Sequence, residues 1–242
     1  MTNENKNNTL LLEVVMFIHK ATVAEWLDKI PLKDFFVFWD KINIDNLSAF
    51  NHCLENAKNE HDWQKFFEGI PILLLQHMNG GHGRWVIPQK ELGSEYRTDF
   101  VIGEEDSDGF HWQAVELESH NAKCFTKNGD YTKELTHAVK QIQDWRSWIR
   151  DNIQYARNER NKNGLGLIDI VPELPGLIII GRRKDLLEKD KYKRQELGNE
   201  INIKIHTYDW VYEQAKARFQ VLNNINDEDY EKIINNKLDK KE

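Results

Sequence analysis

The sequence predicts an α/β fold in which helices flank a central mixed β-sheet and a helical segment precedes the sheet. Three observations predict this class: short apolar runs of strand length, longer segments with apolar residues at helical spacing, and enough apolar content for a core. The chain has 242 residues, of which 40% are hydrophobic and eight are tryptophan. It can therefore bury one sizeable core, or a core and a small appendage.

Residues 1–57 read as amphipathic helix, interrupted at Pro31. Their apolar contacts include Trp26, Phe35, Phe36, Phe38 and Trp39. Two interpretations stay open. This segment either regulates the rest of the chain or mediates assembly, including a homo-oligomer, or it adds helices that pack on the core.

Residues 60–67 predict a short helix with Trp63, Phe66 and Phe67 on one face, and residues 70–78 predict a first strand. A glycine-containing turn follows at residues 79–83. His77 and His82 flank it, but an interval of five residues across a glycine turn is not a secure spacing for metal ligands.

Residues 97–103 and 110–119 predict a β-hairpin, because two apolar runs are joined by a polar turn. Side chains alternate along a strand, so Trp112, Ala114, Glu116 and Glu118 share one face. Both faces of the run are apolar before the acids, which favours a covered, central strand.

Asp99, Glu116 and Glu118 therefore place three carboxylates where two apolar strands bury side chains. Two carboxylates about 4 Å apart repel by roughly 4 kcal/mol at an effective dielectric constant of about 20. A divalent cation turns that repulsion into affinity, and hard oxygen ligands suit Mg²⁺ or Mn²⁺. The alternative is that Glu116 and Glu118 lie at the exposed end of an edge strand and are only solvated.

Residues 131–157 predict a long helix with a core-facing stripe of Leu135, Ala138, Val139, Ile142, Trp145 and Ile149. Residues 177–181 predict a buried strand and residues 201–206 a last strand. Residues 208–222 predict a helix, and residues 227–238 a short polar helix.

The net charge of −7 means that any affinity for DNA must come from a local patch. Two basic segments, 123–150 and 182–194, are candidates, although a solvated helix face would look similar. Arg182 and Arg183 follow a predicted central strand directly. They can hold a phosphate, or they can cap a carboxylate.

With only Cys53 and Cys124 we expect no disulfide framework, which fits a reducing cytosol. The first residues show neither a strongly basic start nor a small-residue cleavage site, so we expect no signal peptide. No run approaches the roughly 18 apolar residues that span a bilayer. We therefore expect a cytoplasmic protein without a membrane partner.

Seven segments resemble, in order and spacing, the nuclease domain of Shedu antiphage defence proteins, over about residues 58–222. This domain is placed in the restriction-endonuclease-like PD-(D/E)xK superfamily, whose signature is an acid, a hairpin spacing and then Glu-x-Lys. The segments are EHDWQKFF (60–67), IPIL (70–73), TDFVI (98–102), VELE (115–118), AVKQIQDW (138–145), PGLIIIGR (175–182) and IKIHTYD (203–209).

The resemblance implies a metal-dependent nuclease that cleaves DNA in defence against phage. It implies that Asp99, Glu116 and Glu118 are catalytic and bind the metal, and that Glu60 supports the metal from its helix. A glutamate in a first helical turn is also favoured by the helix dipole. In related nucleases a glutamine on the helix after the acidic strand points into the site, here Gln141, which could equally be an ordinary boundary amide.

The chain departs from the family pattern at Glu118, where a lysine is usual. A glutamate cannot act as a cation, although it can accept a proton or bind the metal. Lys123 or Lys140 could supply the missing charge and contact DNA, or both could be solvated surface lysines. A nucleic-acid-binding or sensing module that has lost cleavage is therefore a second hypothesis, and a structural assembly subunit is a third. The predicted boundaries are 1–57, 58–222 and 223–242.

Overall fold

The structure is a computed structural model that describes residues 30–79 and 81–238, without the side chain of Leu238. The chain divides into two compact units, Met1–Phe36 and Val37–Glu242. In the first unit the described part contains the 3₁₀ helix η1 (Lys33–Phe35), and the predicted contact at Trp26 lies outside the described residues. The boundaries expected at residues 57 and 222 stay predictions. All further description concerns the second unit.

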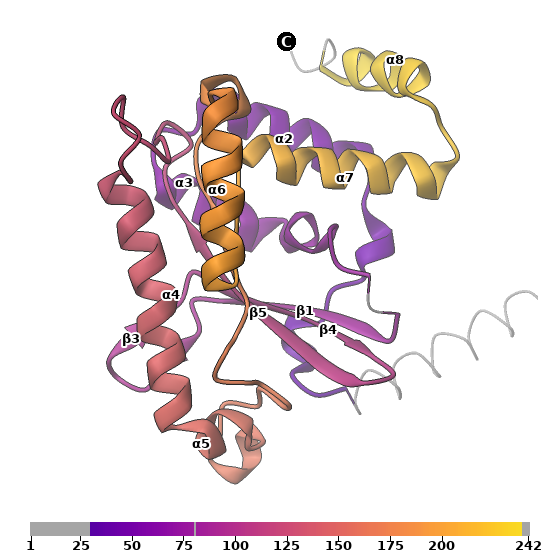
Figure 1. The fold of residues 1–242 in the computed structure, drawn as a ribbon. Coiled ribbons are helices and arrows are strands. Elements are labelled where there is room, and N and C mark those ends of the chain that lie inside the picture. The colour runs from indigo at the N-terminus through magenta and orange to yellow at the C-terminus, as the bar shows by residue number, and fades with distance from the viewer. Residues whose placement is uncertain (1–29, 80, 239–242) are drawn as a thin grey trace, which may run out of the picture. The chain divides into compact units, whose positions relative to one another are not determined.

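A five-stranded mixed sheet forms the centre of this unit, as the sequence predicts (Figure 1). Its order is β1 (Gly83–Pro88), β4 (Phe100–Asp106), β5 (Gly109–Leu117), β6 (Gly176–Ile179) and β7 (Ile203–His206). β4 is antiparallel to both of its neighbours, β1 and β5, and the strands β5, β6 and β7 are parallel. The hairpin of β4 and β5 is confirmed, and β5 is the central strand. A separate pair, β2 (Glu91–Leu92) and β3 (Tyr96–Arg97), lies between β1 and β4 in the sequence.

Helices connect and cover the strands. They are η2 (Trp39–Lys41), α2 (Ile44–Asn56), α3 (Glu60–Gly69), η3 (Pro71–Leu75), α4 (Lys133–Asp151), α5 (Ile153–Arg157), η4 (Arg160–Lys162), η5 (Arg183–Asp185), α6 (Glu188–Ile201), α7 (Tyr208–Asn223) and α8 (Asp227–Leu238). Within the described residues, none of these helices combines the length and apolarity needed to cross a membrane.

The strand predicted at residues 70–78 is wrong, because this segment forms η3 and the first strand is β1. Pro71 stands at the start of the 3₁₀ helix, where its missing N–H costs nothing. Ile72, Leu73, Leu74 and Leu75 are all buried, so their continuous apolar pattern does not distinguish a strand from a short buried helix.

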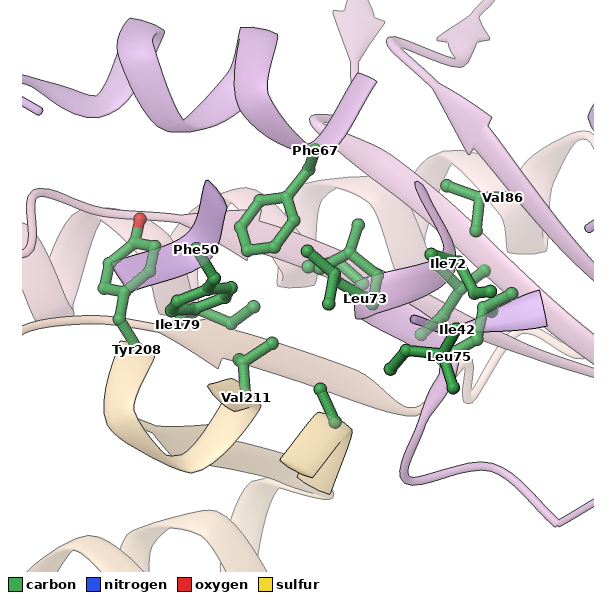
Figure 2. Close-up of a cluster of buried hydrophobic side chains, with 14 of the residues drawn as sticks. Ile42, Phe50, Phe67, Ile72, Leu73, Leu75, Val86, Ile179, Tyr208 and Val211 are labelled. Carbon is green, nitrogen blue, oxygen red and sulfur yellow. The ribbon is translucent and has the colours of Figure 1, made fainter. Parts of the chain in front are cut away.

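One face of the sheet packs against α2, α3, η3 and α7 in a continuous apolar cluster (Figure 2). Phe50, Phe67, Leu73 and Val211 contribute from the helices and Ile179 from the sheet. Val115 and Leu117 of β5 also point into this cluster. The alternation of side chains then turns Ala114 and Glu116 to the opposite face.

The helix α4 covers that opposite face. Its predicted stripe is buried at Leu135, Ala138, Ile142, Trp145 and Ile149, while Val139 is half-buried. A Cβ atom added at Gly176 of β6 would lie 2.9 Å from Ile142 Cδ1, which shows how closely α4 approaches the sheet. The predicted acids of β5 are therefore located beneath a helix.

Candidate metal centre

The three acids predicted from the sequence gather where β4 begins and β5 ends. Phe100 pairs with Val115 in the antiparallel ladder, so the next pair in register is Asp99 and Glu116. The Leu117 N–H donates a 2.8 Å hydrogen bond to Asp99 Oδ2. One step further, the Glu118 N–H donates to the Ile179 carbonyl at 2.9 Å, which fixes this residue against β6.

Glu116 and Glu118 are buried, with 3% and 6% of their surface exposed. The alternative of solvated acids on an edge strand therefore does not describe the structure. Tyr208 supports the strand end from the other side of the sheet, because its hydroxyl donates to the Glu118 carbonyl at 2.8 Å. The Tyr208 ring stacks on Trp63 with 4.0 Å between centroids.

Two side chains of α4 reach the same carboxylates. Gln141 Nε2 donates to Glu116 Oε1, and His137 Nδ1 lies 3.4 Å from Glu118 Oε1. Four residues of a helix advance by about 6 Å and two residues of a strand by about 6.6 Å. The interval from His137 to Gln141 therefore matches the interval from Glu118 to Glu116. Gln141 thus contacts one of the predicted acids, and its role in the site stays a prediction.

Glu116, Glu118 and His137 each offer one ligand atom, and these atoms all lie within 4.8 Å of one another. The three residues could hold a metal ion. Sequence reasoning missed His137, although it lies one helical turn before Gln141 and thus on the same side of α4. Asp99 and Glu60, also expected as ligands, lie outside this group of three, and their charges act on it from nearby.

Burial, together with the nearby charges of Asp99, Glu60 and Glu118, raises the pKa of Glu116 to about 10. Burial also raises the pKa of Asp99 to about 7 and that of Glu118 to about 7. The pKa of Glu60 is raised, again mainly by burial. Within the described residues, no lysine or arginine forms an ion pair with Asp99, Glu116 or Glu118. The part of the chain that the structure describes thus forms a buried acidic cluster without a lysine or arginine partner, which fits a bound metal ion.

We predict that, in the presence of a chelator, the free energy of unfolding falls as the pH rises from about 6.5 to about 8. Groups with a raised pKa stabilise the fold while protonated, and this contribution disappears as the pH rises towards the raised pKa. Glu116 alone should contribute a loss of about 2 kcal/mol over this interval. Groups whose contribution to the free energy of unfolding grows with pH act mainly outside this interval. His206 and His77 have lowered pKa values, so their contribution grows mainly below it, and Lys90 has a pKa lowered to about 8, so its contribution grows mainly above it.

Denaturant titrations at both pH values measure this loss. Saturating Mn²⁺ should abolish or reverse it, because a metal ion favours the charged carboxylates. Equal stability at both pH values in chelator would contradict the prediction.

Within the described part of the chain, each predicted basic residue except Lys123 has a side-chain partner in the protein. Arg182 binds both oxygens of Asp209, with its shortest contact at 3.1 Å, and Arg183 pairs with Glu213. Lys140 is exposed and pairs with Asp144. Lys123 is exposed, as expected of a surface lysine. For Arg182 and Arg183 the structure thus shows the alternative of capping a carboxylate, while their contact with DNA stays a prediction.

We expect Arg182→Ala to lower the free energy of unfolding by about 1–3 kcal/mol, because it leaves Asp209 without its partner. Both side chains are largely covered, at 19% and 22% exposed. The salt dependence of DNA binding should stay unchanged, since this guanidinium is already neutralised. Chemical denaturation and DNA titrations at several salt concentrations measure the two effects. A flatter salt dependence without loss of stability would instead assign Arg182 to DNA.

A mixed sheet flanked by helices, with acids gathered at the end of its central strand, is consistent with a nuclease-like fold. Residues 57–212 match the family model for Shedu protein SduA, C-terminal. Because this match covers more than half of the chain, the chain belongs to that family, and this supports a role in antiphage defence. A search of curated proteins finds no match.

Proposed function

We propose that this protein is a metal-dependent nuclease that hydrolyses DNA phosphodiester bonds in defence against phage. One observation carries the proposal: the buried carboxylates of Glu116 and Glu118 and the exposed imidazole of His137 converge, beside Asp99, at a position that has no lysine or arginine partner among the described residues. Phosphodiester hydrolysis requires positive charge next to a polyanion.

The donor set favours Mn²⁺ or Mg²⁺. Carboxylates suit both ions, and Mn²⁺, as a first-row transition ion, also accepts an imidazole such as that of His137. When bound, such an ion lowers the pKa of a water ligand and neutralises charge on the phosphate. Gln141 keeps Glu116 oriented through its hydrogen bond, and the Leu117 N–H does the same for Asp99.

Glu118 occupies the position where the family usually has a lysine. Its pKa of about 7 suits a group that accepts a proton from water near neutral pH. Its position beside His137 equally suits a metal ligand. We propose that Glu118 binds the ion or orients the attacking water, and that no side chain replaces the lysine as a cation. Lys123 is the basic residue near the start of α4 that we propose for contact with the DNA backbone.

The missing lysine also favours a second candidate function, a nucleic-acid-binding or sensing module that no longer cleaves. A third candidate is an assembly subunit that binds neither metal nor DNA. Metal binding separates the third candidate from the first two, and cleavage separates the first from the second.

The deciding experiment incubates the purified full chain with linear, nicked and circular DNA in Mg²⁺, in Mn²⁺ and in chelator. We expect cleavage with metal and none with chelator. Binding of metal and DNA without cleavage would establish the sensing module, and absence of metal binding by calorimetry would reject both metal-dependent candidates.

A further inference from the structure

A basic groove runs between α6 and the edge strand β7, and nothing in the proposed nuclease site uses it. Its volume is about 470 Å³. All four residues of β7 line it, together with Asn202, which precedes the strand, and with Lys191, Arg194, Gln195, Gly198 and Asn199 of α6. Among the described residues β7 is the last strand of the sheet, so one of its edges has no neighbouring strand there.

The hydrogen-bond pattern shows which backbone groups face the groove. The Ile180 N–H donates to the His206 carbonyl and the Gly176 N–H donates to the Asn202 carbonyl. Backbone groups alternate in direction along a parallel strand, so even-numbered residues of β7 face β6. Ile203 and Ile205 therefore turn their N–H and C=O groups away from the sheet.

These outward groups differ along the strand. At Ile203 the helix lies against the backbone, because a Cβ atom added at Gly198 would lie 2.5 Å from the Ile203 carbonyl oxygen. Ile205 is 4% exposed and lines the groove. No hydrogen bond of its outward N–H and C=O to a residue of the described chain is seen. Buried backbone groups of this kind require a partner.

The charge around the groove has one sign. None of its lining residues, all within the described part of the chain, is acidic. Lys191 pairs with Glu188, but Arg194 is half-buried and its guanidinium has no hydrogen bond or ion pair to any described residue. Lys204 is exposed on β7, likewise without an ion pair in the described region. A lone edge lysine discourages strand pairing, whereas a half-buried, unpaired arginine favours an anionic partner.

We propose that this groove binds an extended acidic peptide segment of a partner protein, which adds a strand to β7. A peptide supplies both an acceptor and a donor for the Ile205 N–H and C=O groups, and its carboxylates complement Arg194 and Lys204. A DNA backbone offers only acceptors and would leave the Ile205 carbonyl facing a phosphate. The strand edge therefore selects a peptide, and the cations select an acidic one.

A synthetic, fluorescent peptide of about ten residues in which pairs of glutamates and pairs of valines alternate tests this proposal, since both faces of such a strand carry glutamate and either register presents acids to the groove. We expect saturable binding to the full chain by anisotropy. Arg194→Glu and Lys204→Glu should each weaken it at least about tenfold, because each reverses a charge that faces the peptide. Lys65→Glu on α3 is the matched control and should bind normally.

Two further measurements separate strand addition from simple attraction of an anion. The same peptide methylated at every backbone nitrogen keeps its charge but has no N–H group to donate from either edge, so it should fail to bind. The Ile205 amide should exchange more slowly with solvent when the unmodified peptide is bound. Lys204 is exposed, so its variant should keep the thermal midpoint of the parent and report on binding alone.

Absence of peptide binding would overturn the proposal. It would also be overturned if the methylated peptide bound equally well, or if Lys65→Glu weakened binding as much as Lys204→Glu. Displacement of the peptide by a single-stranded oligonucleotide of equal charge, without any change in Ile205 exchange, would identify the groove as a nucleic-acid surface instead.

Discussion

Glu116→Gln is expected to reduce metal-dependent DNA cleavage by at least about a hundredfold, since even the residues that only orient metal ligands are worth about 10–100-fold. Glu116 has the most strongly raised pKa of the acids in the site and contributes to the group of three candidate ligands. An amide keeps the size of the side chain but is a weaker ligand than a carboxylate. Single-turnover cleavage in Mn²⁺ and calorimetric titration with Mn²⁺ should both show the loss.

The same variant should be at least as stable as the parent at pH 8 in chelator. The parent must keep a proton on Glu116 or bury its charge, whereas the amide is neutral at every pH. Glu105→Gln on the same hairpin is the matched control, because Glu105 is half-buried near the turn, away from the acids. A large loss of thermal midpoint for Glu116→Gln alone would make Glu116 a structural residue, and unchanged cleavage would reject it as a ligand.

Much of this site could be predicted because it depends on local periodicity. Alternation along β5 places Glu116 and Glu118 on one face, and the hairpin register brings Asp99 opposite Glu116. The apolar stripe of α4 fixes which side of that helix meets the sheet, and Gln141 lies at the edge of the stripe. Predicting these relations requires only the periodicity of side chains in a strand and in a helix, and the length of the hairpin turn between β4 and β5.

The contacts that could not be predicted depend on how distant elements pack. His137 enters the site only because α4 crosses β5 at one particular point along the strand. No pattern within either segment determines that point. Arg182 finds Asp209 at the start of α7, beyond the whole of α6 and β7. The helix α6 was not predicted because its only buried residues are Asp190 and Leu197, so it lacks an apolar stripe.

Glu118→Lys is the second change with a large expected effect. It restores the usual family pattern, and the two candidate functions, binding-only module and nuclease, predict opposite results for it. A degenerate, binding-only module should gain cleavage from a low baseline. An enzyme adapted to three acids should lose metal affinity and activity together.

We expect the loss, because Glu118 is buried and lies beside His137 within the group of three candidate ligands. A lysine there would replace one ligand and direct its ammonium group at the remaining carboxylates, and so compete with the ion for Glu116. Calorimetry with Mn²⁺ and cleavage assays on the same preparations measure the two losses.

Glu118→Gln and His137→Gln are the matched comparisons. If Glu118 and His137 share one ion, each variant should raise the metal concentration needed for activity, and the double variant should cost less than the sum of the two, since loss of either ligand already weakens the shared site. Parent activity and unchanged metal dependence in both single variants would mean that Glu118 and His137 form a surface contact beside the site. Asp99, Glu116 and Glu60 would then have to hold the ion. The family resemblance implies this set of ligands if Glu118, at the usual lysine position, is left out.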